Sequence, residues 1–482
     1  MGWFVPWALL ALYGAVFYLI APSSSEPAGF YEGRDRRGRA PSTAILLASV
    51  FISWIFAKSV TNSANLAAGF GLPGAVAYGA YWLSIPLAAL VIVGLRTRFN
   101  ASSLPQWLAD RYGRAAAWVF LFAILIRLFN EVWSNTAVVG SYFGQRGTSG
   151  FYAGALGFTA LTLLYTLKGG LRSSIVTDSV QAILFALFLL AVLFFGLRSP
   201  GAGLVSYARS GDWALSGGVD LLLVALLQSL SYPFHDPVLT DRGFLSNPPA
   251  TLKAFLWAGI LGFLAIVAFG AIGLPAHVQN LPVDDDAPRA VASSLGTGVL
   301  LVVNVVMLTS AGSTLDSTFS SLSKALDRDA RRVSSARLPD RSLLTGRRLM
   351  VAIAVLGNVP LLFGARILQA TTISGTMVLG LAPIFLLGFF LRAPRSSFHL
   401  AFWAGLAVGI LEVLDLVPAA ARIGDGRYST LLGANFWGLT LATALFVVPI
   451  VLQGARRARS RVVAAQTGHP SPSQHISQNR HS

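Results

Sequence analysis

A group of hydroxyl side chains interrupts an apolar segment that begins near Leu295. Ser310 is followed three residues later by Ser313 and Thr314, which places the three on one face of a helix. Such hydroxyls can simply bond their own helix backbone or join neighbouring helices. Two adjacent hydroxyls one turn after a third also offer the hard oxygen atoms that a small cation requires. We therefore interpret this segment as an ion-binding helix around which the chain is built.

Charged side chains also fall within apolar segments, where a charge is costly unless it has a partner. Arg127 and Glu131 are four residues apart, which suits an ion pair along one helix. Lys58 and Asp236 lie at the expected interruptions of two other segments. We expect these two charges to face one cavity, either as a direct pair or on both sides of a charged solute.

The composition predicts the class of protein. The chain has 482 residues, of which 54% are hydrophobic and 12% charged, whereas a soluble domain carries roughly 25% charged residues. We predict an all-α integral membrane protein with about thirteen transmembrane helices. The expected spans are 3–20, 44–70, 76–94, 116–143, 151–167, 174–197, 219–243, 254–274, 295–322, 349–364, 371–391, 398–416 and 434–453.

The basic residues predict the orientation. The loops that would lie outside the cell hold only seven of them, namely Arg146, Arg198, Arg209, Arg289, Arg366, Arg422 and Arg427. Most of the others fall in loops on the opposite side, which predicts an N-terminus outside and a C-terminus inside. The net charge of +16 then reflects topology, and we expect a lipid bilayer and no nucleic acid as partner. The expected location is the cell (inner, plasma) membrane, as a multi-pass protein.

Two spans contain helix-breaking residues at membrane depth. The span 44–70 is rich in Ser and Asn, and the span 219–243 contains the run Tyr232–Pro237. Interrupted helices five spans apart predict a 5+5 inverted repeat with two broken helices and a binding site at the breaks. The expected divisions are a first helix and basic cytoplasmic loop (1–43), two repeats (44–197 and 219–391), two additional helices (398–453) and a disordered cytoplasmic tail (454–482).

Three motifs resemble the sodium:solute symporter family, which has the LeuT-type inverted-repeat fold. Gly169–Gln181 resembles its G-G-L…T-D-x-x-Q signature, Ser103–Gly113 is similar to the loop before its fourth helix, and Ser313–Asp329 has the spacing of its sodium-site helix. The resemblance implies Na⁺ as coupling ion and no organic cofactor. It also implies ligands from the Ser313 and Thr314 hydroxyls and the Ser310, Ile52 and Ile55 carbonyls, with Asp178 on the ion path to the cytoplasm.

The expected function is secondary active transport, not enzymatic catalysis. Inward sodium flux would be coupled to uptake of a small polar organic solute by alternating access. The expected substrate cavity comprises Trp54, Lys58, Ser59, Asn62, Glu131, Gln228, Tyr232, His235, Asp236 and Asp316. The chain has no cysteine and no H-E-x-x-H motif, so we expect no metal beyond sodium.

Two alternatives stay open at this point. Ser53–Ala57 resembles the urea-transporter branch of the family, which can be proton-coupled. A membrane sensor with the same fold is the second alternative. The residues leave the identity of the solute, the ion stoichiometry and the oligomeric state open.

Overall fold

The computed structural model describes residues 4–199, 201–334, 343–363 and 374–467, with side chains as far as Ser460. Its described residues form helices and connecting turns, without a strand. The longer helices are α1 (Phe4–Ile20), α3 (Thr43–Ser53), α4 (Ala57–Phe70), α6 (Ser84–Phe99), α8 (Arg114–Ser141), α9 (Ser149–Gly169), α10 (Leu171–Gly196), α12 (Val219–Ser229), α14 (Pro248–Gly270), α17 (Thr297–Lys324), α19 (Leu344–Leu356), α22 (Arg395–Val413) and α23 (Ser429–Thr467). The shorter ones are α2 (Pro27–Glu32), α5 (Leu72–Gly79), α7 (Leu104–Tyr112), α11 (Leu204–Ala208), α13 (Pro237–Arg242), α15 (Leu274–Gln279), α16 (Ala287–Leu295), α18 (Ala330–Ser334) and α21 (Leu381–Leu386).

Many of these helices are suited to a bilayer. Within the described residues, nine helical segments are long and apolar enough to cross a bilayer. The number becomes ten if the bent pair α3–α4 counts as one span. The prediction of an all-helical membrane protein is therefore confirmed. The surface agrees, because large apolar side chains such as Leu90, Phe122 and Leu190 are more than 60% exposed. Polar side chains are instead buried inside the bundle, as a lipid environment requires.

The first expected interruption separates α3 from α4, whose axes differ by 57°. Trp54, Ile55 and Phe56 lie between the two helices, and Phe56 has an extended backbone. The second interruption separates α12 from α13 and contains a short 3-10 turn, Tyr232–His235. Pro233 and Pro237 lack the backbone N–H that a continuous helix needs, which explains why this helix breaks here.

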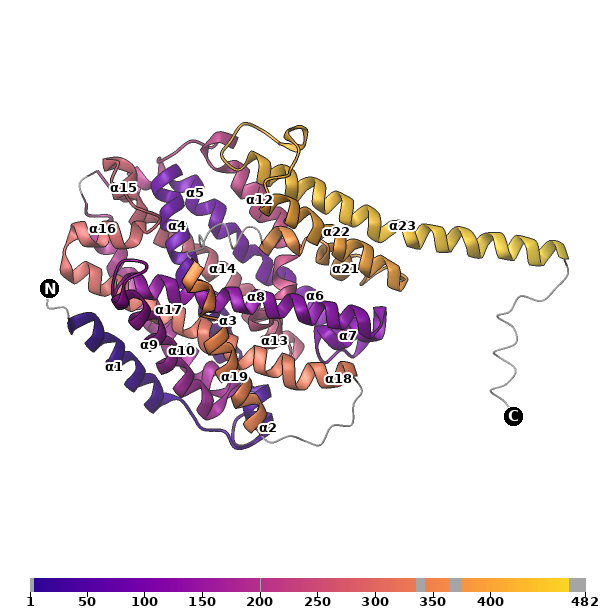
Figure 1. Ribbon diagram of the computed structural model, residues 1–482, viewed down its shortest axis with the longest axis horizontal. Coiled ribbons are helices and arrows are strands. Elements are labelled where there is room, and N and C mark those ends of the chain that lie inside the picture. Colours follow the sequence, from indigo (N-terminus) through magenta and orange to yellow (C-terminus); the bar gives the residue numbers. More distant parts are fainter. Residues whose placement is uncertain (1–3, 200, 335–342, 364–373, 468–482) are drawn as a thin grey trace.

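The helix α17 runs through the middle of the bundle and positions the candidate site (Figure 1). Every residue from Val306 to Lys324 is buried. Gly312 allows α1 to approach it closely, because a Cβ at this position would meet the Tyr13 hydroxyl at 1.7 Å. Its neighbour α10 packs along the same face and carries Asp178.

The end of the chain differs from the expectation. The helix α23 continues to Thr467 and extends beyond the bundle (Figure 1), so residues 454–467 are helical rather than disordered. A run of helix-forming Ala and Arg prolongs the last predicted span, 434–453, beyond its expected end. The remainder of the predicted tail, and the predicted span boundary at 364–373, lie outside the described residues.

Candidate functional site

The break in the first interrupted helix exposes backbone oxygens next to α17. The amide of Ile55 donates to the carbonyl of Ile52 (3.0 Å), which turns the chain at this point. From the opposite side, the Thr314 hydroxyl donates to the carbonyls of Ser310 (3.1 Å) and Ser53 (3.4 Å). The Ser53 hydroxyl is buried and has no hydrogen-bond partner within the described part of the chain. The structure thus brings Thr314 of α17 against the carbonyl of Ser53, the neighbour of the expected ligand Ile52 in the chain.

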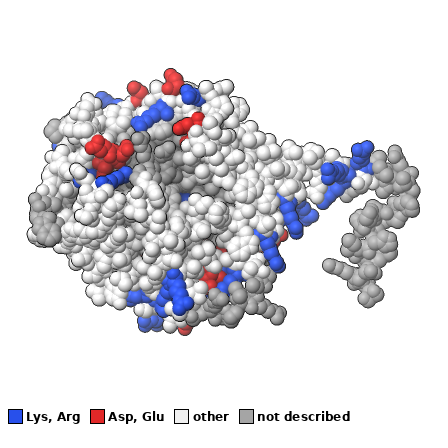
Figure 2. All heavy atoms as spheres, viewed as in Figure 1, with Lys and Arg blue, Asp and Glu red and all other residues white. Residues whose placement is uncertain are grey.

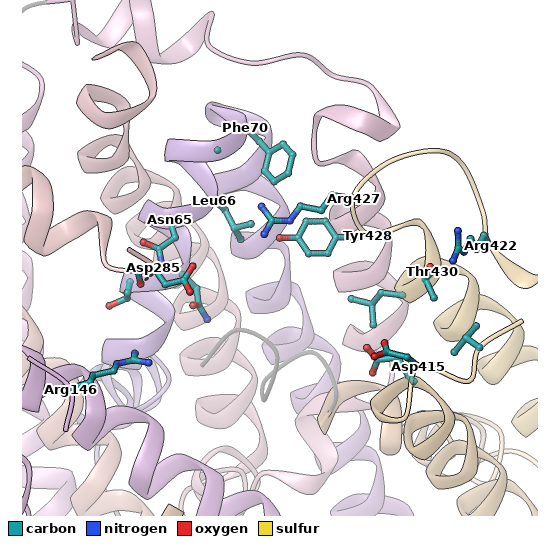
Figure 3. Close-up of a pocket in the computed structure, with 16 residues that line it drawn as sticks. Asn65, Leu66, Phe70, Arg146, Asp285, Asp415, Arg422, Arg427, Tyr428 and Thr430 are labelled. Carbon is teal, nitrogen blue, oxygen red and sulfur yellow. Dashed lines mark hydrogen bonds between the residues drawn. The ribbon is translucent and has the colours of Figure 1, made fainter. Parts of the chain in front are cut away.

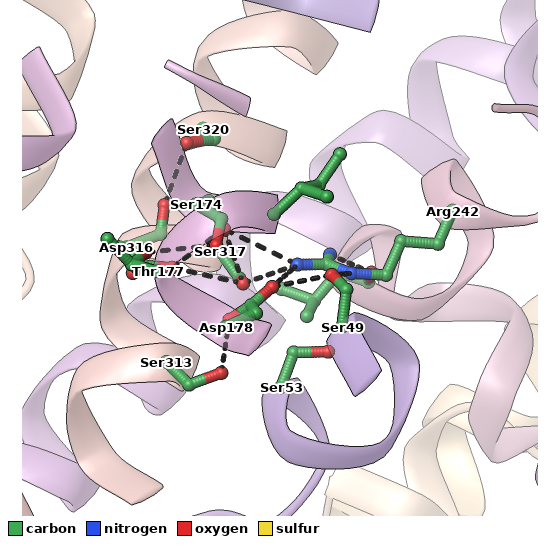
Figure 4. A network of polar contacts seen from close by, with 12 residues as sticks. Ser49, Ser53, Ser174, Thr177, Asp178, Arg242, Ser313, Asp316, Ser317 and Ser320 are labelled. Carbon is green, nitrogen blue, oxygen red and sulfur yellow. Dashed lines mark hydrogen bonds and ion pairs between the residues drawn. The ribbon is translucent and has the colours of Figure 1, made fainter. Parts of the chain in front are cut away.

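The Ser313 hydroxyl connects this place to Asp178. It donates to Asp178 Oδ1 (2.5 Å), while Ser49 donates to Asp178 Oδ2 (2.5 Å). Figure 4 shows the two serines approaching the carboxylate from different helices. Because Ser313 and Thr314 both donate their protons to neighbours, their oxygen lone pairs stay available to a cation. The donor set therefore fits a sodium ion.

Arg242 is the immediate partner of Asp178. Its Nη2 lies 2.8 Å from Asp178 Oδ2 and donates to Ser317 (2.6 Å), and its Nε donates to Ser49 (2.7 Å). Arg242 falls at the end of the expected span 219–243 and was not among the expected site residues, yet it is fully buried beside Asp178. The sequence does not indicate this contact, because Arg242 reaches Asp178 only through the break before α13, which turns this helix back into the bundle.

Asp316 belongs to the same network rather than to the charges at the breaks. Its carboxylate accepts hydrogen bonds from Tyr165 (2.9 Å), Ser174 (2.7 Å) and Thr177 (2.9 Å). Ser174 also bonds Ser317, which connects Asp316 to Arg242 (Figure 4). Asp316 was expected in the substrate cavity. In the structure it lies one turn after Ser313 and faces α9 and α10 instead.

A compact cluster of four buried charges lies between the two helix breaks. Lys58 Nζ is 2.6 Å from Glu131 Oε1, Arg127 pairs with the same carboxylate, and Arg127 Nη2 is 3.2 Å from Asp236 Oδ2. Each of these side chains is fully buried. The expected pairing of Arg127 with Glu131 is present. Lys58 and Asp236 share this cluster, yet no direct contact joins them, so the direct pair is replaced by a chain through Glu131 and Arg127.

Asp236 has a second role in the local fold. Its Oδ1 accepts the backbone N–H of Val238 (3.0 Å), which caps the start of α13. Its Oδ2 accepts from Trp54 Nε1 (3.1 Å) in the other interrupted helix. One carboxylate therefore joins the two breaks, caps a helix and neutralises Arg127.

An aromatic group covers one side of the charge cluster. Trp54 and Tyr232 have ring centroids 6.1 Å apart, and Tyr78, Tyr81 and Trp82 complete the group. Together with Phe56 and Ser59, these rings enclose a space of only about 10 Å³. The expected cavity is thus closed in this conformation.

The remaining expected cavity residues surround the aromatic group. Asn62 donates to the Tyr78 hydroxyl (3.1 Å), and the Tyr81 hydroxyl donates to Gln228 (2.7 Å). His235 contacts the Tyr232 carbonyl through Nδ1 (2.6 Å). It lines a separate cavity of about 200 Å³ together with Arg127.

A wider cavity, which we call the vestibule, opens above these residues. It has a volume of about 460 Å³ and reaches Thr61 and Asn62 on α4. Figure 3 shows Asp285, Arg427 and Tyr428 around it. The loop between α22 and α23 supplies much of its wall, a contribution that the sequence analysis missed because loop residues carry no periodic signal.

The family model of the sodium:solute symporter family matches residues 38–312. The chain belongs to this family. It is therefore a multi-pass membrane transporter that couples solute uptake to sodium, and the expected function is confirmed at this level. The symporter is 23% identical to a sodium/mannose cotransporter of Bos taurus over 448 residues, which are 76% of this chain and 72% of that protein.

Other similar proteins are also transporters. A sodium/myo-inositol cotransporter of Bos taurus is 23% identical over 493 residues, covering 85% of this chain and 68% of that protein. A urea active transporter of Saccharomyces cerevisiae is 25% identical over 253 residues, covering 47% and 34%. The solved structure of a Na⁺-coupled sialic acid symporter, in a substrate-bound outward-open state, matches the fold with a TM-score of 0.71 at 15% identity. It covers 93% of this chain and 98% of that one.

Proposed function

We propose that the symporter takes up a polar organic solute of zero net charge, such as a polyol, a sugar or urea, across the cell membrane. The observation that carries this proposal is the charge cluster, which has two basic and two acidic side chains, all buried. A solute with a net charge would leave an uncompensated charge in a medium of low dielectric constant, at a cost of several kcal/mol. A neutral solute can exchange hydrogen bonds with the cluster without that cost.

The aromatic group supports the same class of solute. Rings such as Trp54, Tyr78 and Tyr232 present flat apolar faces beside the polar edge of the cluster, and Ser59 adds a hydroxyl. A hydroxylated ring or a planar amide has both kinds of surface. The relatives, which include mannose, myo-inositol and urea transporters, agree with this chemistry.

The sodium ion would be bound where α17 faces the first break. We assign it the hydroxyls of Ser313 and Thr314 and the carbonyls of Ser310, Ile52 and Ile55. The support is the Thr314 hydroxyl, which contacts the carbonyl of Ser53 at the first break and that of Ser310 on its own helix. Asp178 would receive the ion next, since it already accepts the Ser313 hydroxyl. Moving one charge inward across 100 mV contributes about 2.3 kcal/mol, which corresponds to about fortyfold accumulation.

The proposed topology keeps thirteen spans, with the N-terminus outside, the C-terminus inside and a 5+5 inverted repeat from 44–197 and 219–391. The positions of the two interrupted helices, α3–α4 and α12–α13, support the repeat. The charges support the orientation: Figure 2 shows acidic and basic side chains together along the upper edge, whereas basic ones predominate along the lower edge and on the extended helix. Helices 398–453 would be additional to the repeats.

The arrangement of contacts supports an outward-facing state. The vestibule gives access from the predicted outer side. On the predicted inner side, Lys324 pairs with Asp241 (2.6 Å) and Tyr31 donates to Asp327 (2.8 Å). These contacts join α13 to the end of α17 and α2 to the turn that follows α17. Both contacts would have to break before the ion could leave inward.

Uptake by proteoliposomes tests the proposed solute class. Radiolabelled myo-inositol, mannose and urea are compared with glutamate and lysine under one inward sodium gradient. We expect sodium-dependent accumulation of at least one neutral solute and none of the two charged ones. Accumulation of glutamate or lysine alone would contradict the proposal, and urea uptake driven by protons without sodium would favour the urea-transporter branch.

A further inference from the structure

A second cavity, which we call the basic cavity, opens at the end of the bundle away from the vestibule. It has a volume of about 1060 Å³ and lies where α1, α9, α10 and α19 meet α2. Its basic lining residues are Arg34, Arg36, Lys168, Arg172 and Arg347, and its acidic ones are Glu26 and Asp35. Figure 2 shows basic side chains gathered along this lower edge of the molecule. The excess of positive charge makes the cavity suited to an anion.

Three of the basic side chains are fixed by the backbone. Lys168 Nζ donates to the Tyr18 carbonyl (2.5 Å), and Arg347 Nε donates to the Leu167 carbonyl (2.9 Å). Arg172 Nη1 donates to the carbonyl of Arg34 (2.7 Å). Each bond uses one donor and leaves others on the same group. The cations are therefore held in place before a ligand binds.

Arg172 also has an unsatisfied donor. Its Nε is buried and has no hydrogen-bond partner among the described residues. A buried donor without a partner costs free energy that an acceptor at this position would recover. Because Arg172 lines the basic cavity, an anion bound there would offer this side chain an acceptor.

Asp35, one of the two acidic lining residues, is engaged outside the cavity. Asp35 accepts the backbone N–H groups of Arg37 and Arg39, both at 2.8 Å, and pairs with the Arg39 guanidinium (2.8 Å). The hydrogen bond from the Arg39 backbone lowers the pKa of Asp35, so this carboxylate stays ionised and engaged with a residue outside the cavity. The cavity keeps its excess of positive charge.

Leu344 lines the cavity, and Leu19 shortly precedes the lining residue Ser23 in the chain. Leu19 at the end of α1 is 81% exposed, and Leu344, which lines the cavity, is 50% exposed. A soluble phosphate would gain nothing from these side chains, whereas the acyl chains of a lipid would cover them. We propose that the basic cavity binds the phosphate-bearing headgroup of an anionic membrane lipid, with the acyl chains along Leu19 and Leu344.

The inference rests on the proposed topology, which places the cavity at the inner leaflet, and not on the proposed solute. Anionic lipids attract basic residues near this surface by about 1 kcal/mol for each residue, which corresponds to about fivefold in affinity. Failure of the lipid test would therefore leave solute uptake unaffected, and the two proposals can be judged separately.

The test measures thermal unfolding of the purified full chain in detergent as dioleoylphosphatidylglycerol is added, because a bound ligand raises the midpoint temperature. Arg36 and Arg37 are adjacent and exposed, but only Arg36 lines the cavity. We expect Arg36→Gln to need about five times more lipid for the same shift, and Arg37→Gln to behave as wild type. The triple variant Lys168→Gln, Arg172→Gln and Arg347→Gln should lose the shift.

Each other outcome of this test contradicts the proposal. Dioleoylphosphatidylcholine giving the same shift would mean that the anionic headgroup is not recognised. Sodium phosphate acting at the same concentration as the lipid would identify a soluble anion as the ligand. Equal behaviour of Arg36→Gln and Arg37→Gln would indicate a general surface charge effect, and this comparison decides the matter even if the triple variant does not fold.

Discussion

Lys58 Nζ lies 2.6 Å from Glu131 Oε1, and both side chains are fully buried between the two helix breaks. This pair connects α4 to α8, and Arg127 extends it to Asp236 at the second break. The charges of the two interrupted helices are thus coupled through a third helix. A movement of either break during transport must reorganise this cluster.

The first prediction concerns that pair. Glu131→Gln leaves two basic groups without a full counter-charge, so we expect a loss of about 3–5 kcal/mol in the free energy of unfolding. Lys58→Met should cause a smaller loss of stability. The double variant should lose less stability than the sum of the two single losses. Thermal unfolding with and without sodium measures these effects.

A matched cycle serves as the control. Lys58→Met combined with Asp236→Asn should show a smaller coupling, because Glu131 and Arg127 lie between the two residues. Equal coupling in the two cycles would contradict the observed order of contacts and would favour a direct pairing of Lys58 with Asp236 in another state.

The second prediction concerns Asp178. Asp178→Asn removes the charge opposite Arg242 and weakens the bond from Ser313. We expect sodium-driven uptake to slow by tenfold or more, while equilibrium binding of the solute changes little, because no solute-facing group is altered. Initial uptake rates and solute-dependent thermal shifts separate the two effects.

Asp110→Asn is the control for that variant. Asp110 is an exposed carboxylate on the predicted inner side, so its replacement should leave uptake unchanged. If Asp178→Asn transports at the rate of Asp110→Asn, Asp178 has only a structural role.

The sequence predicted the elements more reliably than the contacts between them. Hydrophobic spans and the Pro-rich run at Tyr232–Pro237 are local signals, and both interruptions are found where these signals lie. The positions of Arg242 and Asp316 depend instead on how α13 and α17 pack, which no spacing in the chain records. The same reason explains why Lys58 was expected to face Asp236, whereas its observed partner Glu131 is on α8.

The third prediction uses the absence of cysteine from the chain, which makes any introduced thiol the only one to react. Thr430→Cys lies in the vestibule wall, and Ser460→Cys lies on the extended part of α23. In intact cells, a membrane-impermeant maleimide should label Thr430→Cys and not Ser460→Cys. Addition of a transported solute should slow the labelling of Thr430→Cys, because it shifts the symporter away from the outward-facing state.

Permeabilised cells supply the control for accessibility. Both thiols should then react, which shows that Ser460→Cys is protected by its side of the membrane and not by the fold. Labelling of Ser460→Cys in intact cells would place the C-terminus outside and overturn the proposed orientation.

The most direct test of the account is sodium-driven uptake by the variant Ser313→Ala and Thr314→Ala, compared with wild type in the same proteoliposomes. The two hydroxyls are the side-chain oxygens that α17 contributes beside the first break. Wild type should accumulate a neutral solute only under an inward sodium gradient, and the double variant should remain folded but lose both that accumulation and its stabilisation by sodium. Unchanged sodium dependence in the double variant, or equal accumulation driven by a pH gradient without sodium, would contradict the account.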